Sequence, residues 1–431
     1  MTTHVPSSGP QVPPRTPESD TDVVVAGAGP TALFAALRCA RLGHSVVLLS
    51  PQQEFEPAGT GISPLLAPPT LGLLAEDGID TELTEAGQRV LGVDDHGSTG
   101  LLSSWRYTDH TDIARPHGLT VPTGTLVQAA LAQLHTEPGV RIRTGESILA
   151  AQQDHSTVLL TTGPTGDAGR TGHAGGTGDA GDAGAQPAVT GRIRARYAVA
   201  AEGRRSALRD LAGIPLEVSP FDRPAWLLVS PAPPDREPVL LVRHHAPNAL
   251  FTIPVPPASL AVIWSPDQDR AAQLTTDTAG PETAIAQLAT VDTELAAWMD
   301  TVRDHIPPLI RLDFSLWRAT TWRAGRILLL GESAHGLHTL GGQGLNQSLQ
   351  SSASLARAIH DTLTSGQPHR IEAYERIRRP HIEQLQHAQW NHQALRTYNT
   401  TPPKHGAHED FIEAMTHLQP DLTTQLAAPR P

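Results

Sequence analysis

The stretch GRILLLGESAHGLHTLGGQGLN, residues 325–346, decides the fold of this chain. Its apolar run Ile327–Leu330 predicts a buried strand, and Gly331 predicts a turn directly after it. An irregular loop with His335 and His338 follows, and then a glycine-rich helix start. Apolar residues recur at three- and four-residue spacing in that helix, which predicts one buried face: Leu345, Leu349, Ala353, Ala356, Ile359 and Leu363. A glycine-rich helix start presents unpaired N–H groups and the positive end of the helix dipole, so we expect an anionic or electron-rich ligand there.

A second glycine-rich turn, GAGPTA at residues 27–32, follows the apolar run Val23–Ala26. Such a continuous apolar run predicts a strand that is buried on both faces. The residues after it predict a helix from about Pro30 to Leu42 and a strand from Ser45 to Leu49. This order of strand, turn, helix and strand is that of a dinucleotide-binding βαβ unit.

Each position of this turn has a physical role in such a unit. Gly27 permits the tight turn, and Gly29 lets the backbone approach a pyrophosphate. Ala32 replaces a third glycine that allows the helix to pack closely on the strand, which is a tolerable change. The unit also calls for an acidic residue at the end of its second strand to hold ribose hydroxyl groups, and Ser50 stands there.

A third glycine-rich segment, Gly176–Gly181, matches the pattern GxGxxG in full. It lies in a tract of Gly, Ala, Thr and Asp, residues 163–191, that carries no strand or helix pattern. We therefore predict a flexible surface insertion there, and we assign the dinucleotide site to the N-terminal turn.

Composition excludes several classes of protein. At 431 residues the chain exceeds the usual size of a single core, so two or more lobes are expected. The formal net charge of −12 argues against nucleic acid or an anionic membrane as a partner. The single cysteine, Cys39, excludes an intrachain disulfide and a thiolate metal cluster. No apolar run approaches the ~18 residues of a membrane span, and no signal peptide is evident, so we expect a cytoplasmic protein.

From Ala225 to about Ser265 the pattern changes to short strands that are separated by prolines. The predicted strands are Trp226–Ser230, Val239–His245, Leu250–Val255 and Leu260–Trp264. They predict an antiparallel sheet that is inserted in the α/β chain as a second lobe. Helices are predicted at about 281–306, 366–398 and 408–418.

Three motifs in order carry a family resemblance: GAGP at 27–30, AEGRRSALR at 201–209 and GESAHGLHTLGGQGLN at 331–346. With them the chain resembles the group A flavoprotein monooxygenases, the para-hydroxybenzoate-hydroxylase-like family, over roughly residues 21–385. The resemblance implies an FAD-binding domain that is built from several chain segments, with NAD(P)H as a transient co-substrate. It also implies hydride reduction of FAD, addition of O2 and oxygen insertion into a bulky apolar small molecule of specialised, polyketide-like metabolism.

The fold class implied is α/β, with a discontinuous FAD/NAD(P)-type βαβ domain, an inserted antiparallel substrate domain and a C-terminal helical region. Residues 1–20 are predicted to be a disordered leader. The FAD-type domain is assigned to 21–84, 110–215 and 318–365, the substrate domain to 85–109 and 216–317, and the helical region with its tail to 366–431. We expect a monomer or a homodimer.

The motifs and the resemblance together predict a set of cofactor-binding residues. They are Gly27, Gly29, Pro30, Ala32, Ser50, Thr123, Glu202, Gly203, Gly331, Glu332, Gly341, Gly342, Gln343, Gly344, Leu345 and Asn346.

The chain also departs from the family pattern at several of these positions. The altered positions are Ser50 for the ribose-binding acid, Thr123 for an arginine near the FAD phosphates, Glu202 and Glu332 for aspartates, His338 and Thr339 for prolines beside the flavin, and Ser351 for an aspartate in the last helix. The nearest acids to Ser50, Glu54 and Glu56, lie beyond Pro51. Loss of three or four contacts would weaken FAD binding by orders of magnitude.

The altered positions leave three functions open. The first is an FAD-dependent hydroxylase or epoxidase. The second is a family member that has lost flavin redox chemistry and catalyses a cyclisation or rearrangement in the same cleft, and the third is a non-catalytic ligand-binding protein. His338 is the candidate catalytic residue as an acid or base, whereas His335 is interpreted as structural. No metal site is predicted, and Trp105, Trp226, Trp264 and Trp317 are interpreted as core or pocket wall.

Overall fold

The computed structural model describes residues 18–97, 100–110, 114–165, 188–245, 248–266, 268–274, 280–339, 341–391 and 416–427. Most of the predicted leader, residues 166–187 of the predicted insertion and most of the predicted helix at 408–418 lie outside these ranges. Within them, no helix is long and apolar enough to cross a membrane.

A largely parallel sheet forms the centre of the larger domain, in the order β19-β20-β11-β1-β2-β8. Its strands are β1 (Glu18–Ala26), β2 (Val46–Leu49), β8 (Val140–Arg143), β11 (Gly191–Ala200), β19 (Arg323–Ala324) and β20 (Ile327–Leu329), with β9 (Glu146–Gln153) and β10 (Val158–Pro164) attached beside β11. Strands β2, β11 and β20 are parallel to β1 or to one another, while β19 is antiparallel to β20. The apolar runs at 23–26 and 327–330 are fully covered, as continuous apolar strands require.

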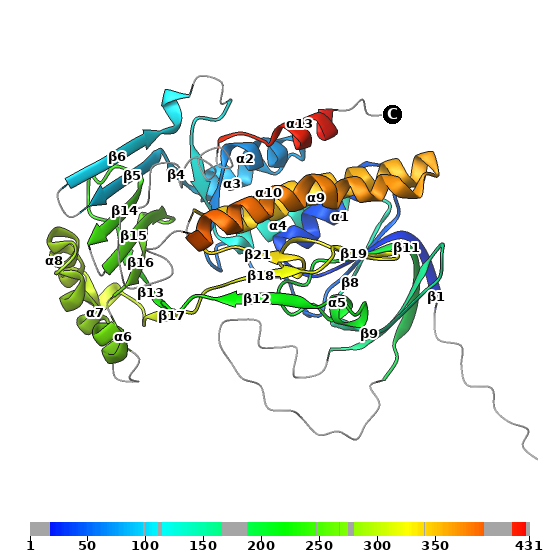
Figure 1. Ribbon diagram of the computed structural model, residues 1–431, viewed down its shortest axis with the longest axis horizontal. Coiled ribbons are helices and arrows are strands. Elements are labelled where there is room, and N and C mark those ends of the chain that lie inside the picture. Colours follow the sequence, from blue (N-terminus) through cyan, green and yellow to red (C-terminus); the bar gives the residue numbers. More distant parts are fainter. Residues whose placement is uncertain are drawn as a thin grey trace, which may run out of the picture.

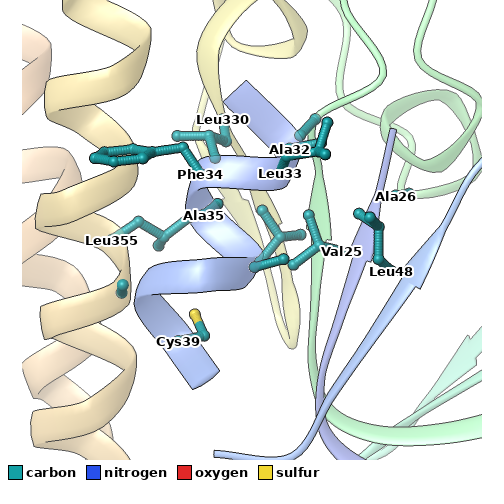
Figure 2. Close-up of a cluster of buried hydrophobic side chains, with 14 of the residues drawn as sticks. Val25, Ala26, Ala32, Leu33, Phe34, Ala35, Cys39, Leu48, Leu330 and Leu355 are labelled. Carbon is teal, nitrogen blue, oxygen red and sulfur yellow. The ribbon is translucent and has the colours of Figure 1, made fainter. Parts of the chain in front are cut away.

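Helices cover this sheet. They are α1 (Pro30–Arg41), α4 (Thr123–Thr136), and the long α9 (Gln343–Ser365). Figure 2 shows the buried cluster that joins α1 to the strands on one side and to α9 on the other, with Phe34, Leu330 and Leu355 among its side chains. Cys39 belongs to this cluster, where burial raises the pKa of its thiol to about 12, so it is an inert core residue.

The second lobe is a seven-stranded sheet in the order β17-β13-β16-β15-β14-β5-β6. Its strands are β5 (Gly92–Gly97), β6 (Gly100–Arg106), β13 (Ala225–Pro231), β14 (Leu240–His245), β15 (Asn248–Val255), β16 (Ser259–Ser265) and β17 (Ile310–Leu312). Three short helices pack on it: α6 (Gln268–Leu274), α7 (Pro281–Leu288) and α8 (Thr293–Thr301). Figure 1 shows this lobe at one end of the molecule, with α6, α7 and α8 on its outer side.

Two three-stranded sheets connect the lobes. One is β12 (Leu216–Pro220), β18 (Ser315–Ala319) and β21 (His335–Gly336); the other is β3 (Leu65–Leu66), β7 (Gly118–Thr120) and β4 (Gln88–Val90). The buried Thr120 hydroxyl donates a 2.6 Å hydrogen bond to the Pro254 carbonyl of the β-sheet lobe. The seam between the lobes is therefore closely packed at β7.

The structure confirms the predicted fold class, and it differs from the prediction at some element ends. Strand β1 begins at Glu18, within the predicted leader. The predicted helix at 281–306 is two helices, because the Asp292 side chain accepts a hydrogen bond from Leu295 N and so begins a new helix. The predicted helix at 366–398 starts as a short 3-10 turn, and α10 spans Glu372–Asn391. A last helix, α13 (Pro420–Ala427), packs against α9 and α10.

Candidate active site

The three predicted motifs meet at the carboxyl-terminal edge of the parallel sheet. Gly27 N donates to Leu49 O, Ala201 N donates to Ala26 O, and Leu330 N donates to Ala200 O, at 2.8–2.9 Å. The ends of β1, β2, β11 and β20 therefore abut one another. In open α/β sheets ligands bind in the crevice outside these strand ends, where the strand order reverses.

Gly27 and Gly29 shape this edge in different ways. Gly27 has φ +140°, and a Cβ on it would overlap the carbonyl oxygen of Ala201. Gly29 is the N-cap residue of α1. Apart from its two neighbours in the chain, no described residue lies within 4 Å of the position that a Cβ on Gly29 would take. Pro30 occupies the first turn of α1, and Ala32 is fully buried against Gly27. The start of α1 thus offers backbone N–H groups towards open space, which fits a pyrophosphate.

Glu202 and Glu332 have opposite roles at the crevice. The Glu202 carboxylate accepts hydrogen bonds from Ser206 Oγ (2.6 Å) and Leu208 N (3.0 Å), so it caps helix α5 (Ala207–Leu211). The Glu332 side chain remains exposed to solvent. Its Oε2 atom lies 3.8 Å from the position that a Cβ on Gly203 would take. Burial raises the pKa of the Glu332 carboxyl above its ordinary value, and the positive charge of Arg204 offsets only part of this rise. A side chain that is largely surrounded by protein and yet reached by solvent is expected on the wall of a hollow.

Arg204 and Trp317 complete this wall, and the sequence analysis did not assign them to the cofactor site. The Arg204 guanidinium lies over the Trp317 ring, 4.7 Å from its centroid. Trp317 Nε1 donates to the Glu332 carbonyl oxygen at 2.9 Å, and a Cβ on Gly336 would overlap the indole ring. Two arginines directly after Gly203 were the only signal available in the sequence.

Gly331 and the start of α9 form a further part of the crevice wall. A Cβ on Gly331 would lie 3.0 Å from Ser348 Oγ and 3.1 Å from Thr31 Cγ2, so Gly331 joins the N-terminal ends of α1 and α9. Gly341 and Gly342 precede α9, and Gly342 has φ +62° as its N-cap residue. The Cβ position of Gly344 has no described neighbour within 4 Å outside its own helix and adjoining residues.

Gln343 and Asn346 are fully buried and bind protein backbone. Gln343 Nε2 donates to Gly341 O at 2.9 Å. Asn346 Nδ2 donates to Leu65 O and Gly342 O at 2.7 Å each, and Asn346 Oδ1 accepts from Ala67 N at 2.8 Å. These amides hold the helix start and the segment at 65–67 together, while Leu345 is half-buried between them. Their side chains therefore shape the site.

Ser50 is buried, and its hydroxyl is engaged with its own loop, since it accepts from Gln52 N and donates to Gln52 O at 3.1 Å. Glu56 instead lies near Thr123 at the start of α4. A Cβ on Gly61 would overlap both the Glu56 carboxylate and the Thr123 hydroxyl, so these two groups flank the same point. The loop after β2 thus places the Glu56 carboxylate beside the start of α4. The sequence alone did not predict this position.

The two motif histidines lie beside the crevice edge in protein interior. His335 is 2% exposed, and burial together with Arg378 lowers its pKa to about 3, so the ring is neutral. His338 is 6% exposed and packs against Phe221 and Phe314, with ring centroids 4.8 and 4.1 Å away. Its backbone is held on both sides by the Gln389 amide. His335 is therefore a neutral interior ring, and the candidate catalytic His338 packs among aromatic side chains.

Comparison with known proteins agrees with this geometry. A family model described as an FAD binding domain matches residues 20–389. The chain belongs to this FAD-binding family. Protoasukamycin 4-monooxygenase of Streptomyces nodosus subsp. asukaensis is 60% identical over 411 residues, which cover 94% of this chain and 96% of the relative. The prediction of an FAD- and NAD(P)H-dependent group A monooxygenase is confirmed.

Solved structures of other proteins share the fold of this chain. PqsL of Pseudomonas aeruginosa superposes with a TM-score of 0.71 at 19% identity, covering 92% of this chain and 99% of PqsL. Diels-Alderase PyrE3 superposes with a TM-score of 0.62 at 21% identity, covering 87% of this chain and 74% of PyrE3. At these identities the fold alone is shared. The redox-neutral alternative therefore gains no support from the likeness to PyrE3, whereas the 60% relative supports the oxidative one.

The residues of the crevice fit FAD. The N-terminus of α1 at Gly29 would hold the pyrophosphate, with Thr123 near the phosphates and Glu56 towards the ribose. Glu332 with Gly203 would hold the chain that leads to the flavin. Gly344 leaves the first turn of α9 free of a side chain where the flavin would approach. When bound, FAD supplies the hydride acceptance from NAD(P)H and the reaction with O2.

Proposed function

We propose that this chain hydroxylates a protoasukamycin-like polyketide at the position that corresponds to the relative's 4-oxygenation. The 60% identity across 94% of the chain and 96% of the relative carries this proposal, because it spans both lobes and the seam between them. The net reaction consumes one O2 and one NAD(P)H with one proton, places one oxygen atom in the substrate and releases the other as water.

The contribution of the protein is to orient the reactants and to exclude water. The start of α9, held by Asn346 against residues 65–67, fixes one wall of the crevice. The Arg204–Trp317 stack, which is bonded to the Glu332 backbone, forms another part of the wall at the end of β20. Rigid walls of this kind hold the substrate at reacting distance and lower the entropic part of the barrier.

The experiment is a reconstitution with 18O2. Purified protein is incubated with FAD, NAD(P)H and protoasukamycin, and the product is analysed by mass spectrometry. We expect a flavin absorbance band, substrate-dependent oxidation of NAD(P)H and a product that contains one 18O atom. A product isomeric with the substrate, formed without NAD(P)H, would establish the redox-neutral function instead. A protein that gains no flavin band would end the proposal.

Two further properties belong to this proposal. The chain acts in the cytoplasm, which supplies the NAD(P)H that it consumes, and it works as a monomer or a homodimer. Light scattering of the FAD-loaded protein distinguishes the two oligomeric states, and cell fractionation tests the location.

A further inference from the structure

Tyr107 is a fully buried residue whose hydroxyl is unpaired. It begins the short 3-10 turn Tyr107–Asp109 directly after β6, and its side chain is 0% exposed. Its Oη has no hydrogen-bond partner among the described residues. Burial of a hydroxyl without a partner is unfavourable, so native proteins pair nearly all such groups or reserve them for a ligand.

Trp105 presents a second unpaired donor beside the first. Its Nε1 is buried and has no partner in the described parts of the chain. The Trp105 ring lies 4.5 Å from the Tyr107 ring and 5.1 Å from the His110 ring, centroid to centroid. Trp Nε1 can only donate a hydrogen bond, and Tyr Oη readily does. Each of these two groups is therefore an unused donor that an acceptor oxygen of a ligand would satisfy.

The location of the pair connects it to the FAD crevice. A Cβ on Gly118 would lie 3.1 Å from Tyr107 Oη and 2.7 Å from Leu65 Cδ1. Leu65 Cβ in turn lies 3.2 Å from the Cβ position of Gly342, at the start of α9. One leucine side chain therefore lies between the tyrosine hydroxyl and Gly342, the N-cap residue of α9.

The pair also lies at the seam between the two lobes. Tyr107 and Trp105 pack in one cluster with Leu65 and Ala67 from the FAD domain and with Leu240 and Ile253 from the β-sheet lobe. Pockets for small molecules form preferentially at such domain interfaces, with apolar walls and a few polar groups that set orientation. The unpaired Trp264 Nε1 differs, since Trp264 lies in the separate core under α6–α8.

We propose that Tyr107 and Trp105 donate hydrogen bonds to a carbonyl or hydroxyl oxygen of the organic substrate and so position its oxygenated carbon towards the flavin. The inference rests on the proposed monooxygenase function and adds the group that recognises the substrate. The substrate is accordingly an apolar molecule with an acceptor oxygen near its reacting carbon. Tyr107 and Trp105 act as positioning residues.

The test compares Tyr107→Phe and Trp105→Phe with the matched control Tyr374→Phe. Tyr374 is equally buried, but its hydroxyl donates to Leu329 O at 3.0 Å. We expect Tyr107→Phe to keep or raise the melting temperature, because it removes an unpaired polar group. We expect it to weaken protoasukamycin binding, measured by isothermal titration calorimetry, and to raise KM about ten-fold, or about 1.4 kcal/mol.

We also expect Tyr107→Phe to release more oxidised NAD(P)+ per product formed, since a substrate that is held loosely is oxygenated less often. Tyr374→Phe should lower the melting temperature and leave KM and substrate affinity unchanged. Wild-type KM, substrate affinity and coupling in both Tyr107→Phe and Trp105→Phe would overturn the inference while the proposed function stood. Failure of the wild-type protein to form an oxygenated product would instead overturn the proposed function. The calorimetric comparison would then still decide whether Tyr107 and Trp105 bind the organic molecule.

Discussion

Gly27 and Gly29 stand two residues apart and restrict substitution for different reasons. At Gly27 the backbone has φ +140° and Ala201 fills the Cβ position, whereas at Gly29 the backbone is extended and the Cβ position faces open space. We predict that Gly27→Ala lowers the free energy of unfolding by about 2 kcal/mol or more, through strain and overlap. Gly29→Val should leave stability nearly unchanged and weaken FAD binding at least ten-fold. Urea unfolding of the FAD-free proteins and flavin titration separate the two effects.

An equal loss of stability in both variants would mean that Gly29 serves only the packing of the turn. A Gly29→Val protein that binds FAD with wild-type affinity would move the pyrophosphate away from the start of α1.

His335 predicts a pH dependence with a defined sign. Its pKa is lowered to about 3 in the folded chain, compared with 6.5 for an ordinary histidine. Above pH 6.5 neither state binds the proton, so His335 contributes no pH dependence. Below it only the unfolded chain binds the proton, and stability falls by up to about 1.4 kcal/mol per pH unit until the pKa of the folded state is reached.

The variant His335→Phe isolates this term, because the other titrating groups remain in both proteins. From pH 7.5 to pH 5.5 the stability of wild type should fall relative to the variant by about 1.4 kcal/mol. Urea unfolding at the two pH values measures the difference. A pH-independent difference would show that the folded protein accepts the proton on His335.

At this scale the sequence predicted backbone positions more reliably than side-chain contacts. The motif spacing predicted turns at Gly27, Gly29 and Gly331, and these glycines lie shortly after β1 and β20, since strand ends and turns follow from local pattern. It did not predict that Glu202 and Ser50 bond to their own loops, because side-chain direction depends on neighbours far along the chain. Arg204 and Tyr107 were missed for the same reason, whereas Trp317 was interpreted only as core or pocket wall.

A buried arginine packs against helix α9 and has no carboxylate partner among the described residues. Arg378 of α10 is fully buried and bonds to Ser351 Oγ at 3.1 Å, to Gln347 and to Gln419, and burial lowers its pKa to about 10. Within the described residues it forms no ion pair. Ser351 stands where the family pattern has an aspartate, and the side-chain acceptors that bond to Arg378 here are neutral.

We predict that Ser351→Asp raises the free energy of unfolding by about 1.5–3 kcal/mol, because it supplies a charged acceptor to Arg378. Thermal unfolding checks the prediction. Ser352→Asp is the matched control, since Ser352 is equally buried but its hydroxyl donates to the Thr31 and Ser348 carbonyl oxygens. It should destabilise, as a buried unpaired carboxylate does. Equal loss in both variants would show that the site at 351 has no room for a carboxylate.

Helices and strands were predicted well where the hydrophobic pattern is long. They were predicted poorly where a single residue ends a helix. The βαβ unit at 23–49 and the strands of the second lobe follow from apolar runs and prolines. The break at Asp292 depends on one side-chain hydrogen bond, which a periodic pattern cannot reveal. The two small connecting sheets were not predicted, because β3 and β21 have two residues each.

At the scale of the whole molecule, the two largest hydrophobic cores among the described residues lie in the FAD domain and under α6–α8. FAD should stabilise the protein by mass action, since the crevice exists only in the folded FAD domain. At a free FAD concentration of 100 Kd we predict a gain of about 2.7 kcal/mol. Differential scanning calorimetry with and without FAD measures the shift in Tm, and Gly29→Val should show a smaller one. An unchanged Tm would mean that FAD does not bind the native state.

The order of strands in the central sheet has a consequence for biosynthesis. β1 pairs with β11, and β11 pairs with β20, so strands near residues 20, 195 and 328 must all be present before the sheet is complete. At ~5–20 residues per second, a ribosome needs roughly 15–60 s to pass from the first of these strands to the last. During this interval the nascent N-terminal unit has an unpaired apolar edge at β1, which we expect chaperones to shield. Ribosome-arrested chains that end before residue 346 should retain no flavin, so the cofactor can enter only when synthesis is nearly finished.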